Sequence, residues 1–103
     1  MRSVRLSRTF LESFDELLAQ GEAKFDAKVI AEKRARVRRT IERFLVVHPE
    51  AKAPHPVLGL RVYPITRTPF VVLYDFNDAE LRVHFILHRH ASLRDLDPAS
   101  AEW

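Results

Sequence analysis

The chain has 103 residues, of which 47% are hydrophobic and 30% charged, and its formal net charge is +3. That length supports one compact domain, which buries roughly 60–70% of the surface of the unfolded chain. The lack of cysteine excludes disulfides, a thiol nucleophile and Cys-based metal sites, and two glycines are too few for a phosphate-binding glycine loop. Because no apolar run approaches the roughly 20 residues of a membrane span and no signal-peptide pattern opens the chain, we expect a soluble cytoplasmic protein that does not contact a membrane.

The chain opens with the pattern of a short strand followed by a helix. Apolar and basic residues alternate over positions 4–6, and Ser7 is a typical N-cap residue. Apolar residues at positions 10, 14, 17 and 18 then have the spacing of an amphipathic helix, which we expect over residues 8–20. Gly21 is expected to end this helix in a left-handed conformation.

A second amphipathic helix is predicted over residues 25–47, so that the two helices form a hairpin over residues 8–47. Asp26 lies near the start of this helix, where the helix dipole favours a negative charge. Within it, residues 32–43 include six basic and two acidic side chains, a local charge of +4 that exceeds the net charge of the whole chain. Such a charge attracts an acidic protein segment or nucleic acid. The alternative is a solvated helix face.

The C-terminal half has the pattern of a sheet. Three prolines between residues 48 and 56 indicate a linker. Strands are expected over residues 58–63, 70–76 and 81–88, within a sheet region of residues 57–90. In the last strand, Leu81, Val83, Phe85 and Leu87 are expected to share one face, and the tail 91–103 to pack on the sheet. We therefore predict one α+β domain over residues 1–103, with the order β-α-α-β-β-β and the helical hairpin on one face of a small antiparallel sheet.

The histidines of the last strand could serve acid–base or metal chemistry. His84 and His88 would share one strand face about 13 Å apart, too far to bind one ion together. His88 and His90 could share a zinc ion only with a third ligand, and no acidic residue has suitable spacing, so we expect no metal and no cofactor. A metal-independent nuclease would need a base, an acid and cations, for which Arg61, His88 and His90 are candidates. The alternative is that these histidines face solvent or a binding groove.

Three segments resemble the RelE/ParE superfamily of type II toxin–antitoxin toxins: residues 60–64 (LRVYP), 70–74 (FVVLY) and 86–88 (ILH). The resemblance extends over residues 4–96. RelE-like members, which are ribosome-dependent mRNA endonucleases, commonly have an arginine after the aromatic residue that opens the third strand. Here Val71 occupies that position.

ParE-like members, which inhibit DNA gyrase, typically have a Tyr-Pro segment before that strand and a Leu-His pair near the end of the last one. Tyr63-Pro64 and Leu87-His88 match this pattern. The Arg-Asp pair that usually follows the histidine directly is displaced here to Arg94-Asp95. The resemblance therefore implies a ParE-like chain.

That resemblance implies a toxin that poisons DNA gyrase without being an enzyme, in a module of the kind that stabilises plasmids. The alternative is a RelE-like, metal-independent endonuclease that cleaves mRNA on the ribosome. The implied partner is a ParD-like antitoxin whose acidic C-terminal segment wraps the hairpin and the sheet, with Arg34 and Arg38 as candidate contacts. The candidate target-binding residues are Arg61, Arg67, His88, Arg89 and Arg94.

Overall fold

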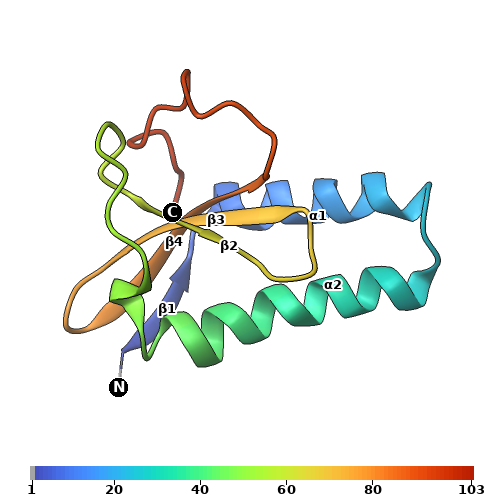
Figure 1. Cartoon of the computed structure of the whole chain (residues 1–103), viewed down its shortest axis with the longest axis horizontal. Helices are drawn as coiled ribbons and strands as arrows, with labels where there is room; N and C mark the ends of the chain where they lie inside the picture. The colour runs from blue at the N-terminus through green and yellow to red at the C-terminus, as the bar shows by residue number, and fades with distance from the viewer. Residues whose placement is uncertain (1) are drawn as a thin grey trace.

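The computed structural model describes residues 2–103. Its strands and α-helices are β1 (Ser3–Leu6), α1 (Arg8–Glu22), α2 (Ala27–Arg39), β2 (Arg61–Pro64), β3 (Phe70–Phe76) and β4 (Glu80–His88). A π-helical segment η1 (Thr40–Leu45) continues α2, and a short 3-10 turn η2 (Pro49–Ala51) lies in the predicted linker. Figure 1 shows α1 and α2 as a hairpin that runs along the sheet. The predicted α+β class and the order of elements are confirmed.

The four strands form a mixed sheet in the order β1-β4-β3-β2. β3 is antiparallel to both β2 and β4, whereas β1 is parallel to β4, so the prediction of an antiparallel sheet was wrong in this respect. Alternation in a sequence indicates which side chains face a core but carries no information on the direction of the neighbouring strand. β1 leads directly into α1, and at the junction the Ser7 N–H donates to the carbonyl of Val83 on β4.

The sheet has a core on each face. The hairpin covers one face, where the buried side chains are Phe10, Phe14, Leu18, Ile30, Val37, Ile41, Leu45, Val72, Tyr74, Leu81, Val83 and Ile86 among others. The opposite face has a smaller core of Leu58, Leu60, Val71, Leu73 and Phe85. Leu93, Leu96 and Ala101 of the C-terminal tail pack against this smaller core, as predicted for the tail.

The first helix begins as predicted and ends later. The Ser7 side chain accepts a hydrogen bond of 2.8 Å from the Phe10 N–H, which confirms its role as N-cap. The helix continues through Gly21 to Glu22, so the prediction that Gly21 ends it in a left-handed conformation was wrong. A Cβ atom at Gly21 would lie 2.9 Å from Cδ1 of Ile30, which indicates that this glycine permits close packing of α1 on α2.

The second helix differs from the prediction at both ends. The Asp26 side chain accepts from the Val29 N–H and caps α2, which leaves Phe25 outside the helix. After Arg39 the helix adopts π geometry, in which the Val46 N–H donates to the Ile41 carbonyl. The predicted single α-helix over residues 25–47 is therefore an α-helix followed by a π-helical segment.

Strand β2 begins at Arg61, later than the predicted residue 58. Gly59 has a φ of 76°, which turns the chain, and its N–H donates to the carbonyl of His55. Leu58 and Leu60 are both buried in the smaller core. Their burial, which the sequence pattern attributed to a strand, is therefore achieved by a tight turn.

A bulge in β4 interrupts the predicted alternation. Leu73 lies opposite Phe85 and Tyr74 lies opposite Val83, so His84 has no partner on β3. Beyond the bulge the faces exchange, and Phe85 packs in the smaller core while Val83 packs under the hairpin. The prediction that Leu81, Val83, Phe85 and Leu87 share one face was therefore wrong. None of the helices within residues 2–103 is long and apolar enough to cross a membrane.

Candidate functional site

Four cations surround a shallow depression at the end of the sheet where β3 begins and β4 ends. The depression has a volume of about 460 Å³. Its cationic side chains come from four segments: Lys24 from the connection between the helices, Lys33 from α2, Arg67 from the turn between β2 and β3, and Arg89 from the residue after β4. Among the described residues, 2–103, no acidic side chain lines it. We call this surface the basic depression.

Local hydrogen bonds hold the backbone at the two arginines of the basic depression. Arg67 has a φ of 61°, a left-handed conformation that costs a non-glycine residue roughly 1–2 kcal/mol. The buried Thr68 stabilises this turn, since its hydroxyl donates to the Ile65 carbonyl and accepts from the Phe70 N–H. The Arg89 N–H donates to the Pro69 carbonyl at 2.7 Å, which joins the end of β4 to the same turn.

The charges of the basic depression are not neutralised within the chain. Among residues 2–103, none of its four cations forms an ion pair with a carboxylate. Lys33 Nζ instead lies 4.9 Å from the centre of the Phe25 ring, which is half-exposed. Like charges in one place repel one another unless an anion lies between them, so the surface attracts anionic groups.

Two histidines lie beside the basic depression. The His88 and His90 rings are 5.2 Å apart, and the His90 N–H donates to Nδ1 of His88. His84 lies elsewhere: its Nε2 is 3.0 Å from Oδ1 of Asp75, on the face away from the hairpin. The expectation that His84 and His88 share a face was wrong because the bulge between them shifts the alternation of side chains from one face of the sheet to the other. Within residues 2–103, no group of three or more His, Asp or Glu side chains could hold a metal ion.

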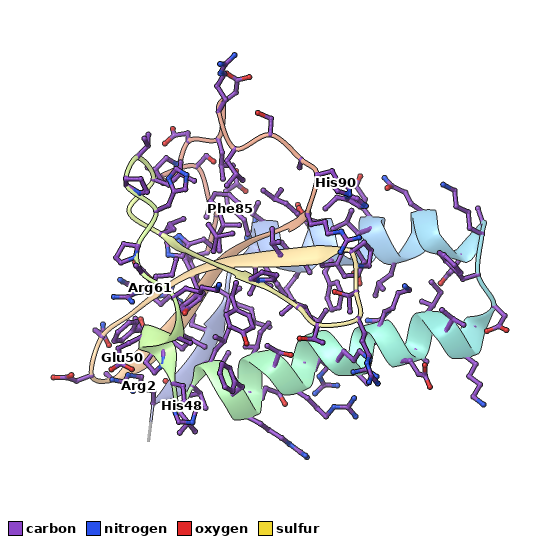
Figure 2. The ribbon with its side chains drawn as sticks, in the orientation of Figure 1. Arg2, His48, Glu50, Arg61, Phe85 and His90 are labelled. Carbon is purple, nitrogen blue, oxygen red and sulfur yellow. The ribbon has the colours of Figure 1, made fainter. Side chains whose placement is uncertain are left out.

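Three of the five predicted target-binding residues therefore lie together: Arg67, His88 and Arg89. Arg61 does not join them. Its cross-strand neighbour is Tyr74, four residues along β3 from Phe70, which is the neighbour of His88, and four strand residues span about 13 Å. Figure 2 shows Arg61 and His90 at opposite ends of the sheet.

Arg61 and Arg94 have other surroundings. The Arg61 guanidinium donates to the Lys52 carbonyl and lies 5.0 Å from the centre of the Phe76 ring. Arg94 is exposed in the tail and does not line the basic depression. The proposed nuclease set of Arg61, His88 and His90 is thus divided between two ends of the molecule.

The two candidate antitoxin contacts lie on a different surface, an apolar groove of about 290 Å³ between α1, β1 and α2. Leu6 and Leu11 are exposed along it. Arg34 lies 4.0 Å from Asp15, and Arg38 lies 3.5 Å from Glu42. Both arginines therefore have a carboxylate nearby. These exposed pairs are weak, each worth about 0–1 kcal/mol.

Sequence reasoning missed a polar cluster on the face of the sheet away from the hairpin. Arg82 donates to both carboxylate oxygens of Asp75 at 2.9 Å, and the His84 ring contacts that carboxylate as well. The Trp103 ring packs edge-on against His84 with centres 4.8 Å apart, and Arg5 lies 5.0 Å from the Trp103 ring. The cluster attaches the end of the tail to the sheet. Asp75 and Arg82 are cross-strand partners, and Arg5 on β1 is the partner of Arg82. The cluster therefore depends on strand pairing and on the path of the tail, which the sequence pattern does not reveal.

Tyr74 is a titratable residue in the core under the hairpin. Burial raises the pKa of its hydroxyl above the ordinary value, because the phenolate would lose its solvation. The hydroxyl donates to the Pro49 carbonyl at 2.7 Å, which connects the sheet to η2. Its role is structural.

No protein-family model matches the sequence, and no curated protein matches it. Among solved structures, the fold is similar to that of a chain from a structure titled "Chromosomal ParDE TA system from P. aeruginosa", with a TM-score of 0.66. The two chains are 17% identical, and the similarity covers 85% of this chain and 96% of that chain. An identity this low establishes a common fold alone. The fold predicted from the resemblance to the RelE/ParE superfamily is therefore confirmed.

Proposed function

We propose that this protein is the ParE-like toxin of a type II toxin–antitoxin module, that it acts in the cytoplasm on DNA gyrase, and that a ParD-like antitoxin neutralises it. The observation that supports this most is the similarity of fold to nearly the whole of a chain from a ParDE system. The Tyr63-Pro64 and Leu87-His88 segments point to the same branch. The basic depression, which includes three of the candidate target-binding residues, is the proposed contact with the target.

A supercoiling assay tests the target. Purified protein added to DNA gyrase, relaxed plasmid and ATP is expected to inhibit supercoiling in a dose-dependent manner. The double variant Arg67→Ala/Arg89→Ala should raise the half-inhibitory concentration about tenfold, since each lost charge contact costs a few tenths to 1 kcal/mol. Arg39→Ala/Arg43→Ala, which removes two exposed cations outside the basic depression, is the matched control and should change it less than about twofold. Folded protein in molar excess that leaves supercoiling intact would refute the gyrase target.

The antitoxin is proposed to lie in the apolar groove. Because Arg34 and Arg38 already have carboxylates beside them, the apolar side chains should supply most of the affinity. Leu11→Ser should weaken binding of the product of the adjacent reading frame roughly tenfold or more. Arg34→Ala should weaken it by about fivefold at most. Isothermal titration calorimetry measures both, and a larger loss for Arg34→Ala would contradict this assignment of the groove.

The second candidate function is a RelE-like mRNA endonuclease. The adjacent rings of His88 and His90, next to Arg67 and Arg89, could supply a base, an acid and phosphate contacts. Primer extension on mRNA from cells that express the protein would reveal cleavage at ribosome-bound codons. Loss of that cleavage in His88→Ala, with supercoiling by gyrase unaffected by the wild-type protein, would establish this alternative.

A further inference from the structure

An apolar surface adjoins the basic depression. A second depression, which shares Lys24, Phe25, Lys33, Pro69 and His88 with the first, continues inward between the end of the hairpin and the sheet. Its floor consists of Leu17, Leu18, Ile30 and Phe70. Leu18, Ile30 and Phe70 are buried core residues, so the floor is held by the packing of the domain. A preformed apolar surface thus adjoins the four cations, two of which, Lys24 and Lys33, also line it.

This combination selects a class of ligand. A ligand without charge would leave four cations close together with no counter-charge, and a purely ionic ligand would leave the apolar floor in contact with water. An apolar side chain with carboxylates on either side of it would cover the apolar floor and also neutralise the cations. Such a group occurs in an acidic peptide segment that carries one aliphatic or aromatic residue.

A single strand of nucleic acid suits this surface less well. Proteins bind single strands with aromatic faces on which successive bases stack, along a track of cations that follows the phosphates. Here the floor is mostly aliphatic. The exposed aromatic ring at its edge, Phe25, already has the Lys33 ammonium over its face. Lys24 and Lys33 line both the floor and the basic depression, while Arg67 and Arg89 line the basic depression alone, so the cations gather beside the floor.

We infer that the basic depression and its apolar floor bind an acidic peptide segment with one apolar anchor residue. The anchor side chain lies on Leu17 and Ile30, and the flanking carboxylates contact Lys24, Lys33, Arg67 and Arg89. The inference deepens the proposed function, on which it rests for the statement that this segment belongs to the target protein. The chemistry of the segment follows from the surface alone.

Fluorescence anisotropy with short labelled peptides tests the inference on the full chain. The probe is fluorescein-labelled DEFED. One control peptide, DESED, keeps the charges and lacks the anchor, and another, NQFQN, keeps the anchor and lacks the charges. DEFED should bind about tenfold more tightly than DESED, as expected for burial of an aromatic ring, and NQFQN should bind more weakly than DEFED. A five-nucleotide oligouridylate is the nucleic-acid comparison and should bind more weakly than DEFED.

Protein variants locate the binding site. Arg67→Ala/Arg89→Ala should weaken DEFED binding about tenfold, and Arg39→Ala/Arg43→Ala, which removes the same charge elsewhere, should change it less than about twofold. Thermal melts confirm that the variants fold, and the chemical shifts of Leu17 and Ile30 methyl groups report contact with the anchor independently of any variant. Equal binding of DEFED and DESED, equal effects of both variants, or tighter binding of the oligouridylate would overturn the inference.

The two proposals can fail separately. If DEFED binds at the basic depression but the wild-type protein leaves supercoiling intact, the gyrase target is wrong and the peptide site stands. If supercoiling is inhibited and DEFED does not bind, the peptide site is wrong and the gyrase target stands.

Discussion

Replacing Ser7 by alanine tests how much the Ser7 hydroxyl stabilises the bulge in β4. The Ser7 side chain is fully buried between β1 and α1 and makes two hydrogen bonds. Its oxygen accepts from the Phe10 N–H at 2.8 Å, and its hydroxyl donates to the carbonyl of His84 at 2.6 Å. His84 is the extra residue of the bulge, so one hydroxyl both caps a helix and supplies the donor that the bulge lacks on the sheet.

The cost can be worked out from these two bonds. Loss of an N-cap costs about 1 kcal/mol. Loss of the donor leaves the His84 carbonyl unpaired at a site that Ser7 itself fills, which costs roughly 1–3 kcal/mol. The free energy of unfolding of Ser7→Ala should therefore fall by about 2–4 kcal/mol. For a domain of this size the melting temperature should fall by roughly 10–25 °C.

The chain offers a matched control. Asp26 caps α2 with one hydrogen bond of 3.0 Å, is exposed, and holds no other group. Asp26→Ala should lower the free energy of unfolding by about 1 kcal/mol or less. Urea unfolding followed by circular dichroism measures both variants. If Ser7→Ala costs no more than Asp26→Ala, the bond to the bulge contributes nothing and the reasoning is refuted.

Three further substitutions test other features of the structure. Tyr74→Phe removes the hydrogen bond to the Pro49 carbonyl, which should lower the free energy of unfolding at pH 8 by about 1 kcal/mol. Because burial raises the pKa of Tyr74, the free energy of unfolding of the wild type should fall above about pH 10, by up to roughly 1.4 kcal/mol per pH unit. Tyr74→Phe lacks this ionisation, so urea unfolding at pH 11 should show a smaller difference in stability between the two proteins than at pH 8. An unchanged difference would contradict the pKa shift. Gly59→Ala should cost about 1–2 kcal/mol in the same assay, because its φ is 76°, although no neighbouring atom lies in the way; a neutral result would show that the turn can adjust. Arg67→Asn should raise the melting temperature by a few degrees, since asparagine tolerates a positive φ better than arginine, while it weakens inhibition of supercoiling; a lower melting temperature would show that the arginine stabilises the turn.

The helices could be predicted from local pattern and the strand pairing could not. Ser7 and Asp26 are local signals, since each caps a helix by a bond to a residue three positions later. The parallel pairing of β1 with β4 joins segments more than 75 residues apart, and the bond from Ser7 to the bulge residue His84 has a separation of 77. The bulge itself lies in the pairing of β3 with β4, where the alternation of the sequence does not mark it. Gly21 shows the same limit, because the close approach of Ile30, whose Cδ1 would lie 2.9 Å from a Cβ at Gly21, comes from the other helix and gives no local signal.

The candidate site shows a similar division. The sequence singled out Arg67, His88 and Arg89, and the fold brings them together. It also singled out Arg61, which the register of β2 on β3 places at the other end of the sheet. Lys24 was missed because it lies in a connection without a motif, and only the tertiary structure shows that it lines the same depression as Arg67.

The basic stretch of the second helix is divided between the two surfaces. Arg34 and Arg38 face the apolar groove, where Asp15 and Glu42 lie beside them. Lys33, the neighbour of Arg34, faces the basic depression and has no carboxylate beside it among the described residues. The local charge of +4 therefore overstates the attraction of the groove for an acidic partner and understates that of the basic depression, which adds cations from three other segments. If an acidic antitoxin segment were to bind by charge, the basic depression would attract it more strongly than the groove. An antitoxin long enough to reach from the groove along α2 to Lys33 would then cover the surface proposed to contact the target, and shortening it at that end should restore inhibition of gyrase without abolishing binding.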